Sequence, residues 1–393
     1  MLPFSSFEFF LIMFAYIALA ALCKHFSNYI NYRSVLFLLN ASFLLIIYPK
    51  PWHFLLLILY SYSATYLVTE VFRFKNKIYG VLLLLLPMLL VKAGFRFSFY
   101  PFELNNLISF AGLSYASFRI MSYYMDRVPA EPFAPFPSYF NYLSFTPTLL
   151  IGPIDRYGHF KESEDNAFRA ITYPNFIIGW NSLIKGVVFK YIFAEITDRY
   201  WLNGSTGSGS TLIHFISDMY AYYVYLFFDF AGYSFMALGI GKMMGMEVPA
   251  NFSNPFIALN PQDFWRRFHI SLGDWLRDYF FTPLYKFFTR KKGLKPYPLL
   301  RQNTALILTF LLMGLWNGFY LNYILSGLLF GTYSAVHNTY AAKCKKAGKD
   351  VVFADLNPVI VRTVSIIIMF NLAAIALYIF SGRCPMPGHE IQF

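Results

Sequence analysis

Charged residues and cysteines are scarce in this sequence. Asp, Glu, Lys and Arg make up 13% of its 393 residues, while 57% are hydrophobic and 21% aromatic. Soluble proteins carry about 25% charged residues, and a soluble core cannot bury this much apolar side chain. The three cysteines, Cys23, Cys344 and Cys384, have neither metal-ligand spacing nor the spacing of a disulfide framework. The composition therefore excludes an ordinary soluble protein and gives no indication of a metal site.

Several common motifs are also missing. The chain has no Walker loop, no GxSxG, no HExxH and no internal repeat, so an ATP-driven pump, the common hydrolases and a solenoid lack support. The formal charge of +12 invites a nucleic-acid partner. However, the basic residues stand in short clusters between apolar runs, as the positive-inside rule predicts for a membrane protein. We therefore expect a lipid bilayer, and no nucleic acid, around this chain.

Long apolar runs recur from Phe7 to Phe380 with short polar gaps. They predict one membrane-embedded, all-α domain over residues 1–393 with about 11 transmembrane helices, since a crossing takes about 20 residues. Residues 139–152 look too short for a crossing and predict a re-entrant element, and residues 212–245 look long enough for a bent pair. The predicted spans are 7–23, 34–48, 53–72, 78–93, 104–124, 139–152, 175–196, 212–245, 303–321, 322–341 and 359–380.

The distribution of lysine and arginine predicts the orientation. Residues 1–23 contain neither, whereas Lys24, Arg33, Arg73, Lys75 and Lys77 follow the first and third spans. This bias places the N-terminus outside the cell membrane and the two densest clusters, 286–301 and 343–349, in the cytoplasm. The hairpin between these clusters should rise from the cytoplasmic side, with Asn317 near its turn.

Polar residues are dense in one part of the chain, where apolar surroundings make them expensive. Ionisable groups at membrane depth cost several kcal/mol unless they are paired or hydrated, so their density predicts a polar cavity or a buried re-entrant element. These residues are Asp229, Asn251, Asn254, Asp263, Arg266, Arg267, His269, Asp274, Arg277 and Asp278.

Residues 262–281, QDFWRRFHISLGDWLRDYFF, have apolar residues at every third or fourth position and predict an amphipathic helix. One interpretation is an interfacial helix whose arginines Arg266, Arg267 and Arg277 reach lipid headgroups. His269 supports a second interpretation, because a neutral imidazole can take a proton from a hydroxyl near pH 7. A structural role for a single buried histidine remains the alternative.

Four segments together resemble the membrane-bound O-acyltransferase family. They are GPIDRY at 152–157, FDFAGYSFMALGIGKMMG at 228–245, the run from NFSNPF to WRRFHISLGDWLRDY ending at Tyr279, and GLWNG at 314–318. Their order and spacing carry the resemblance, which covers residues 104–340. It implies a ring of helices with re-entrant or interfacial helices around a central tunnel. An acyl donor would enter this tunnel from the cytoplasm and an acceptor hydroxyl from the opposite side.

The GPIDRY form, and a chain that ends after one span beyond the GLWNG hairpin, are similar to the branch that transfers D-alanine. That resemblance implies a D-alanyl thioester on the phosphopantetheine arm of a small acidic carrier protein as donor, so no cofactor need be bound by the chain itself. The acceptor would be a hydroxyl of teichoic acid, lipoteichoic acid or a related cell-envelope polymer. Open alternatives are a polysaccharide O-acetyltransferase of the alginate type and a non-catalytic exporter or scaffold. A small membrane helper peptide is a further partner to consider.

One residue departs from the family pattern. The family carries an invariant histidine in a GxWHG-type motif, and this sequence has Asn317 there. Asparagine cannot accept the proton, although it can orient a hydroxyl or a thioester carbonyl. His269 is then the candidate base, and Asn317 is a natural variant, a sign of a silent relative, or an engineered change.

The remaining site residues follow from the same resemblance, in supporting roles. Residues expected to line or support the tunnel are Asp155, Arg156, Asp229, Tyr233, Arg266, Arg267, Trp275, Arg277, Asp278 and Trp316. A basic and apolar segment would dock the acidic carrier, with plain positive-inside charge as the alternative. Its residues are Leu284, Lys286, Phe287, Phe288, Arg290, Lys291 and Lys292.

Overall fold

Helices form all of the regular secondary structure in the part of the chain that a computed structural model describes. That part comprises residues 6–48, 50–73, 77–97, 112–128, 131–203, 212–348 and 357–384. Within it, one isolated antiparallel bridge joins Phe252 to Phe268. The prediction of an all-α fold is confirmed.

Six helices are long and apolar enough to cross a membrane, judged by length and composition over the described residues. The count of about 11 stays a prediction, because shorter apolar helices such as α2 (Tyr32–Ile47) and α4 (Lys77–Phe97) fall below that length or composition. The six are α1 (Phe7–Lys24), α3 with its π-helical end (Trp52–Val71), α9 with its π-helical continuation (Tyr173–Leu202), α10 (Leu212–Met243), α14 (Pro298–Asn317) and α16 (Pro358–Phe380).

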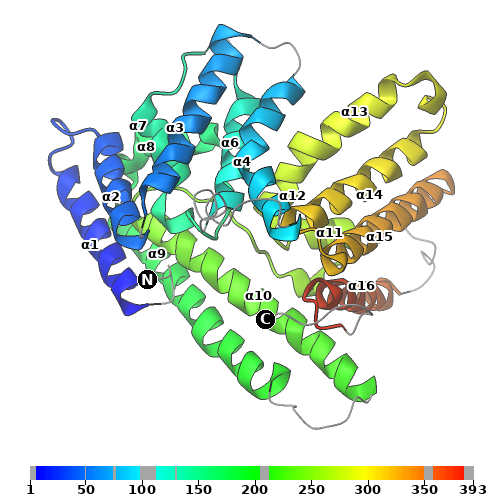
Figure 1. The fold of residues 1–393 in the computed structure, drawn as a ribbon. Coiled ribbons are helices and arrows are strands. Elements are labelled where there is room, and N and C mark those ends of the chain that lie inside the picture. Colours follow the sequence, from blue (N-terminus) through cyan, green and yellow to red (C-terminus); the bar gives the residue numbers. More distant parts are fainter. Residues whose placement is uncertain are drawn as a thin grey trace. The chain divides into compact units, whose positions relative to one another are not determined.

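The described residues group into two units. The first unit spans residues 1–188 and 232–250, and the second spans residues 189–231 and 251–393. In the first unit, α1 and α2 lie side by side (Figure 1). Its remaining helices include α6 (Leu113–Asp126), α7 (Phe136–Ser144), α8 (Tyr157–Ala170) and the α-helical part of α9 (Tyr173–Val188).

A buried carboxylate ties three helices of the first unit together. Glu164 on α8 is 1% exposed. It accepts hydrogen bonds from Arg33 Nε of α2 at 2.9 Å, and from Ser138 Oγ and Asn141 Nδ2 of α7 at 2.7 and 2.8 Å. Because each oxygen is satisfied and one partner is cationic, the charge is tolerated away from water.

Glycines let backbones approach closely in both units. A Cβ on Gly186 of α9 would lie 2.6 Å from the carbonyl oxygen of Gly232 of α10. In the second unit, a Cβ on Gly314 of α14 would lie 2.3 Å from the carbonyl oxygen of Tyr323, on α15 (Leu321–Lys346). Small residues at such contacts are typical of helix pairs in membranes.

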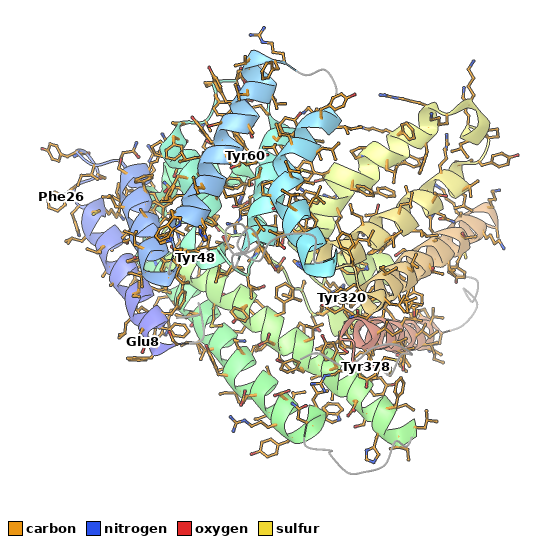
Figure 2. The ribbon with its side chains drawn as sticks, viewed as in Figure 1. Glu8, Phe26, Tyr48, Tyr60, Tyr320 and Tyr378 are labelled. Atoms are coloured by element: carbon orange, nitrogen blue, oxygen red, sulfur yellow. The ribbon has the colours of Figure 1, made fainter. Side chains whose placement is uncertain are left out.

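The second unit contains the hairpin of α14 and α15, with α16 packed against α15 (Figure 1). Figure 2 shows Tyr320 at the start of α15 and Tyr378 on α16. The ring of Tyr378 contacts Phe215 of α10, with 5.2 Å between centroids. The unit also holds α11 (Pro261–Trp265), α12 (Ile270–Leu276) and α13 (Thr282–Arg290).

Three expectations about elements need correction or completion. Residues 212–243 form one continuous helix of 32 residues and not a bent pair, because no proline interrupts them. Residues 139–152 hold the end of the 9-residue α7 and a 3-10 turn at Thr146–Thr148, which are too short to cross. The span expected at 104–124 begins outside the described residues, and its described part belongs to α6.

The Glu164 cluster predicts a large stability effect. Glu164→Ala leaves the Arg33 charge and two amide and hydroxyl donors without this partner, and we expect a loss of about 3 kcal/mol in the free energy of unfolding. Thermal unfolding of the purified protein in detergent measures it. Glu162→Ala, an exposed carboxylate on the same helix, is the matched control. Equal melting temperatures for the two variants would contradict this role of the cluster.

Candidate functional site

A sharp turn at His269 interrupts the segment for which a single amphipathic helix was predicted. That prediction is wrong, since residues 261–281 form α11, a turn, α12 and a π-helical continuation. His269 is the N-cap of α12 and has left-handed backbone angles, φ 51° and ψ 51°. A histidine in this region is uncommon and needs support from its surroundings.

The support comes from the loop at residues 251–253, which follows α10. The backbone N–H of Ser253 donates to the carbonyl of Arg267 at 2.9 Å, and that of Ile270 donates to the carbonyl of Asn251 at 3.0 Å. The side chain of Asn251, which is buried, accepts from the N–H and the hydroxyl of Ser271 at 3.1 and 2.6 Å. These bonds hold both sides of the turn and fix the position of His269.

The imidazole of His269 lies in apolar surroundings. Its ring packs edge to face on Phe230 of α10, with 4.7 Å between centroids. Its Nδ1 is buried and has no hydrogen-bond partner among the described residues. His269 lies outside the six candidate spans, and burial lowers its pKa to about 3. The ring is therefore neutral at pH 7, as a proton acceptor must be.

Two of the three arginines named near His269 in the sequence form ion pairs of their own. Arg267 Nε contacts Asp263 Oδ1 at 2.8 Å, within one helical turn. Arg277 contacts Asp274 at 2.6 Å and Asp278 at 2.8 Å. These carboxylates hold the arginines, which explains how so many charges fit in one segment. In the same segment the side chain of Arg266 is exposed, and Trp275 is buried with its ring 5.1 Å from that of Tyr279.

Asn317 is the last residue of α14 and is exposed, while Trp316 before it is half-buried. Its Nδ2 donates to the carbonyl of Met313 at 2.9 Å, one turn earlier in the same helix. The amide thus has a fixed orientation. Asn317 lies at the turn of the α14–α15 hairpin, as the sequence predicted.

Asp229 forms an ion pair that the sequence did not indicate. Its Oδ1 contacts the Nζ of Lys190, and both residues lie in candidate spans of the second unit. Lys190 is in a π-helical turn, Phe189–Ala194, a distortion common at functional sites. Charged pairs at membrane depth are functional candidates by default. Lys190 was missed because its partner is 39 residues away and no local pattern connects them.

Asp155 and Arg156 lie in the first unit, as does the half-buried Tyr233. The buried Asp155 accepts from the backbone N–H of Arg156 at 2.7 Å, and its Oδ1 lies 2.7 Å from Nδ1 of His159. The hydrogen bond to Asp155 raises the pKa of His159, whose side chain is 46% exposed. This pairing was missed in the sequence analysis.

The predicted docking segment includes α13 and the loop after it. Lys291 Nζ lies 4.7 Å above the ring of Phe287, which is 51% exposed. Leu284 and Phe288 are half-buried, whereas Lys286, Arg290, Lys291 and Lys292 are exposed. The segment therefore offers cationic and aromatic groups together. Among the described residues, no group of three His, Cys, Asp or Glu side chains is placed to hold a metal ion.

Several apolar helices, closely packed through glycines, define an integral multi-pass membrane protein. The sequence profile of the membrane-bound O-acyltransferase family matches residues 50–380. The chain belongs to this family.

Individual relatives agree with the family match. The teichoic acid D-alanyltransferase of Bacillus subtilis is 33% identical over 290 residues, which cover 73% of this chain and 72% of the relative. That of Streptococcus thermophilus is 30% identical over 313 residues, 76% of this chain and 74% of the relative. The probable alginate O-acetylase of Pseudomonas fluorescens is 32% identical over 246 residues, 60% of this chain and 46% of the relative.

The Asp155–His159 pair predicts a pH-dependent stability. A raised folded-state pKa means that the pair stabilises the fold fully below the unfolded value of about 6.5, and that this contribution is lost as the pH rises through the folded value. Near pH 5.5 the melting temperature of wild type should therefore be higher than that of His159→Gln. The margin should be modest because the ring is half exposed. The margin should shrink towards pH 9.

The measurement is the melting temperature of both proteins across this pH range. His25→Gln removes an exposed histidine of the same unit and serves as the control. A difference between wild type and His159→Gln that grows with pH would contradict the assignment.

Proposed function

We propose that the protein is a membrane O-acyltransferase that moves D-alanine from a carrier-protein thioester to a hydroxyl of teichoic acid, lipoteichoic acid or a related envelope polymer. The observation that carries the proposal is the neutral His269, held in a left-handed turn by the Asn251 loop, in a chain whose relatives include two teichoic acid D-alanyltransferases. The donor's phosphopantetheine belongs to the partner, so the chain itself need bind no cofactor.

The wider arrangement is part of the same proposal. About 11 transmembrane helices would surround a central tunnel in the cell membrane, with the N-terminus outside. Cationic clusters on the cytoplasmic side would receive the acidic carrier, and the polymer would enter from the other side. A small helper peptide would complete the assembly in the bilayer.

In the proposed reaction, the acceptor hydroxyl oxygen attacks the thioester carbonyl carbon. A C–O bond forms, the C–S bond breaks, and the hydroxyl proton passes through His269 to the departing thiolate. The low pKa of His269 makes a lasting imidazolium costly, so proton removal and proton delivery would be concerted. Asn317 would hold the carbonyl or the hydroxyl through its amide.

The other predicted residues would support this chemistry. The ion pairs of Arg267, Arg277 and Asp229 would keep polar walls in place without joining the reaction. Arg266, Trp275, Asp278 and Trp316 lie in the same unit as His269 and would line or brace the donor path. Asp155, Arg156 and Tyr233 would stabilise the first unit.

A second candidate function is O-acetylation of an exported polysaccharide, which the similarity to an alginate O-acetylase favours. The two functions differ in the donor. Incubation with acetyl and with D-alanyl donors in parallel separates them, because the proposed enzyme should transfer the D-alanyl group at the higher rate.

The test of the proposed chemistry is transfer from a radiolabelled D-alanyl carrier protein to envelope acceptor by the purified protein. We expect transfer by wild type, a loss of about 100-fold or more in His269→Ala, and a gain in Asn317→His, which adds an imidazole at the family position. His25→Ala, an exposed histidine, should retain the wild-type rate.

Each failure has its own meaning. Transfer that appears only in Asn317→His would mark a disabled enzyme and contradict the role given to His269. Silence in both proteins would exclude the D-alanyl function.

The docking surface on α13 makes a separate prediction. Phe287→Ser removes an exposed aromatic group from the proposed interface, and we expect the KM for the carrier to rise about 10-fold with little change in kcat. Phe26→Ser is the matched control, because Phe26 is 52% exposed in the segment after α1 (Figure 2). Steady-state kinetics against carrier concentration measures both. An unchanged KM in Phe287→Ser would contradict the docking surface, and the cationic residues of this segment would then be explained by the positive-inside rule alone.

A further inference from the structure

Arg301 is a buried cation without an anion. It lies in the first turn of α14 and is 8% exposed. Its Nε is buried, and the guanidinium has neither a hydrogen-bond nor an ion-pair partner among the described residues. Its Cζ lies over the ring of Tyr285 on α13, 5.9 Å from the ring centroid. An uncompensated buried charge is costly, so Arg301 needs a counter-charge from outside the described chain.

The helix end next to Arg301 carries positive charge as well. α14 is 20 residues long, and its N-cap, Tyr297, makes no side-chain hydrogen bond. The N–H groups of Leu299 and Leu300 find no acceptor in the described residues. Arg301 lies in the same first turn of α14 as these free donors. Both features favour an anion at the same place.

The surrounding sequence adds to this field. Residues 284–301 contain six cationic side chains and no acidic one. A carboxylate of the segment itself therefore cannot neutralise Arg301. Its five donors in a planar fork match the oxygen atoms of a phosphate group, and the free N–H groups of a helix start are typical phosphate ligands.

We propose that Arg301 and the first turn of α14 form a phosphate site, and that its occupant is the phosphodiester of the donor's phosphopantetheine arm. The assignment of the occupant rests on the proposed function. α13 carries the proposed docking surface and packs against α14, so an arm that leaves a docked carrier meets this site early. Lipid headgroups carry the same chemistry, but they meet exposed cations such as Lys291 and Lys292 before one that is nine-tenths buried.

The test is direct binding, which needs no turnover. Isothermal titration of the detergent-purified protein compares phosphopantetheine with pantetheine, which differ by the phosphate alone. Wild type should bind the phosphorylated compound about 10-fold to 100-fold more tightly, and Arg301→Gln should bind the two about equally. Arg301→Lys, which keeps a charge without the fork, should restore part of the preference.

Two controls make the result specific. Arg169→Gln removes an exposed arginine of α8 and should keep the full preference for the phosphorylated compound. Size-exclusion profiles and melting temperatures show whether Arg301→Gln has folded, and if it has not, Arg301→Lys and wild type still decide the question.

Opposite results would overturn the inference. Equal binding of both compounds by wild type, or a preference that survives in Arg301→Gln, contradicts the site. If phosphatidylglycerol added to the detergent raises the melting temperature of wild type but not of Arg301→Gln, while the two pantetheines bind alike, the occupant is a lipid. A phosphate-dependent affinity in a protein that transfers no D-alanine would retain the site and reject the proposed function.

Discussion

Pairing of polar groups in apolar surroundings is the constraint on which the rest of this structure depends. An unpaired charge or donor away from water costs more than most packing contacts return. Glu164 therefore accepts hydrogen bonds from Arg33, Ser138 and Asn141 on two other helices. In the second unit, Lys190 forms an ion pair with Asp229. Among the described residues, a few buried atoms lack partners, and two of these, on His269 and Arg301, are the places where we propose that ligands act.

The turn at His269 illustrates how the same constraint builds a reactive position. A regular helix through residues 262–281 would carry the histidine on its side, with the backbone groups used internally. Hydrogen bonds to the Asn251 loop replace some of those internal bonds, so one helix can end and the next can begin at His269. The left-handed backbone is then stabilised without glycine, and the imidazole is presented against Phe230.

Much of the fold could be predicted from the sequence, because hydropathy runs report directly on helices in a bilayer. Spans such as 303–321 and 359–380 agree with α14 and α16 within a few residues. The break at His269 could not be predicted, because the side-chain spacing around it is helical and the cause lies 18 residues upstream, at Asn251. The partners of Asp155 and Asp229 could not be predicted for a similar reason. Pairing depends on which helices are neighbours, and composition does not reveal it.

The hairpin of α14 and α15 has a consequence for the depth of Asn317. At Gly314 the main chains of α14 and α15 are so close that no side chain fits between them. The two helices therefore cannot slide along each other by rearranging side chains. The distance along α14 from its start to Asn317 is about 30 Å, set by the helical rise. In a membrane of another thickness, the bilayer would have to thicken or thin locally around this rigid hairpin. Bilayer composition thus becomes a variable that sets how far the asparagine stands from either surface.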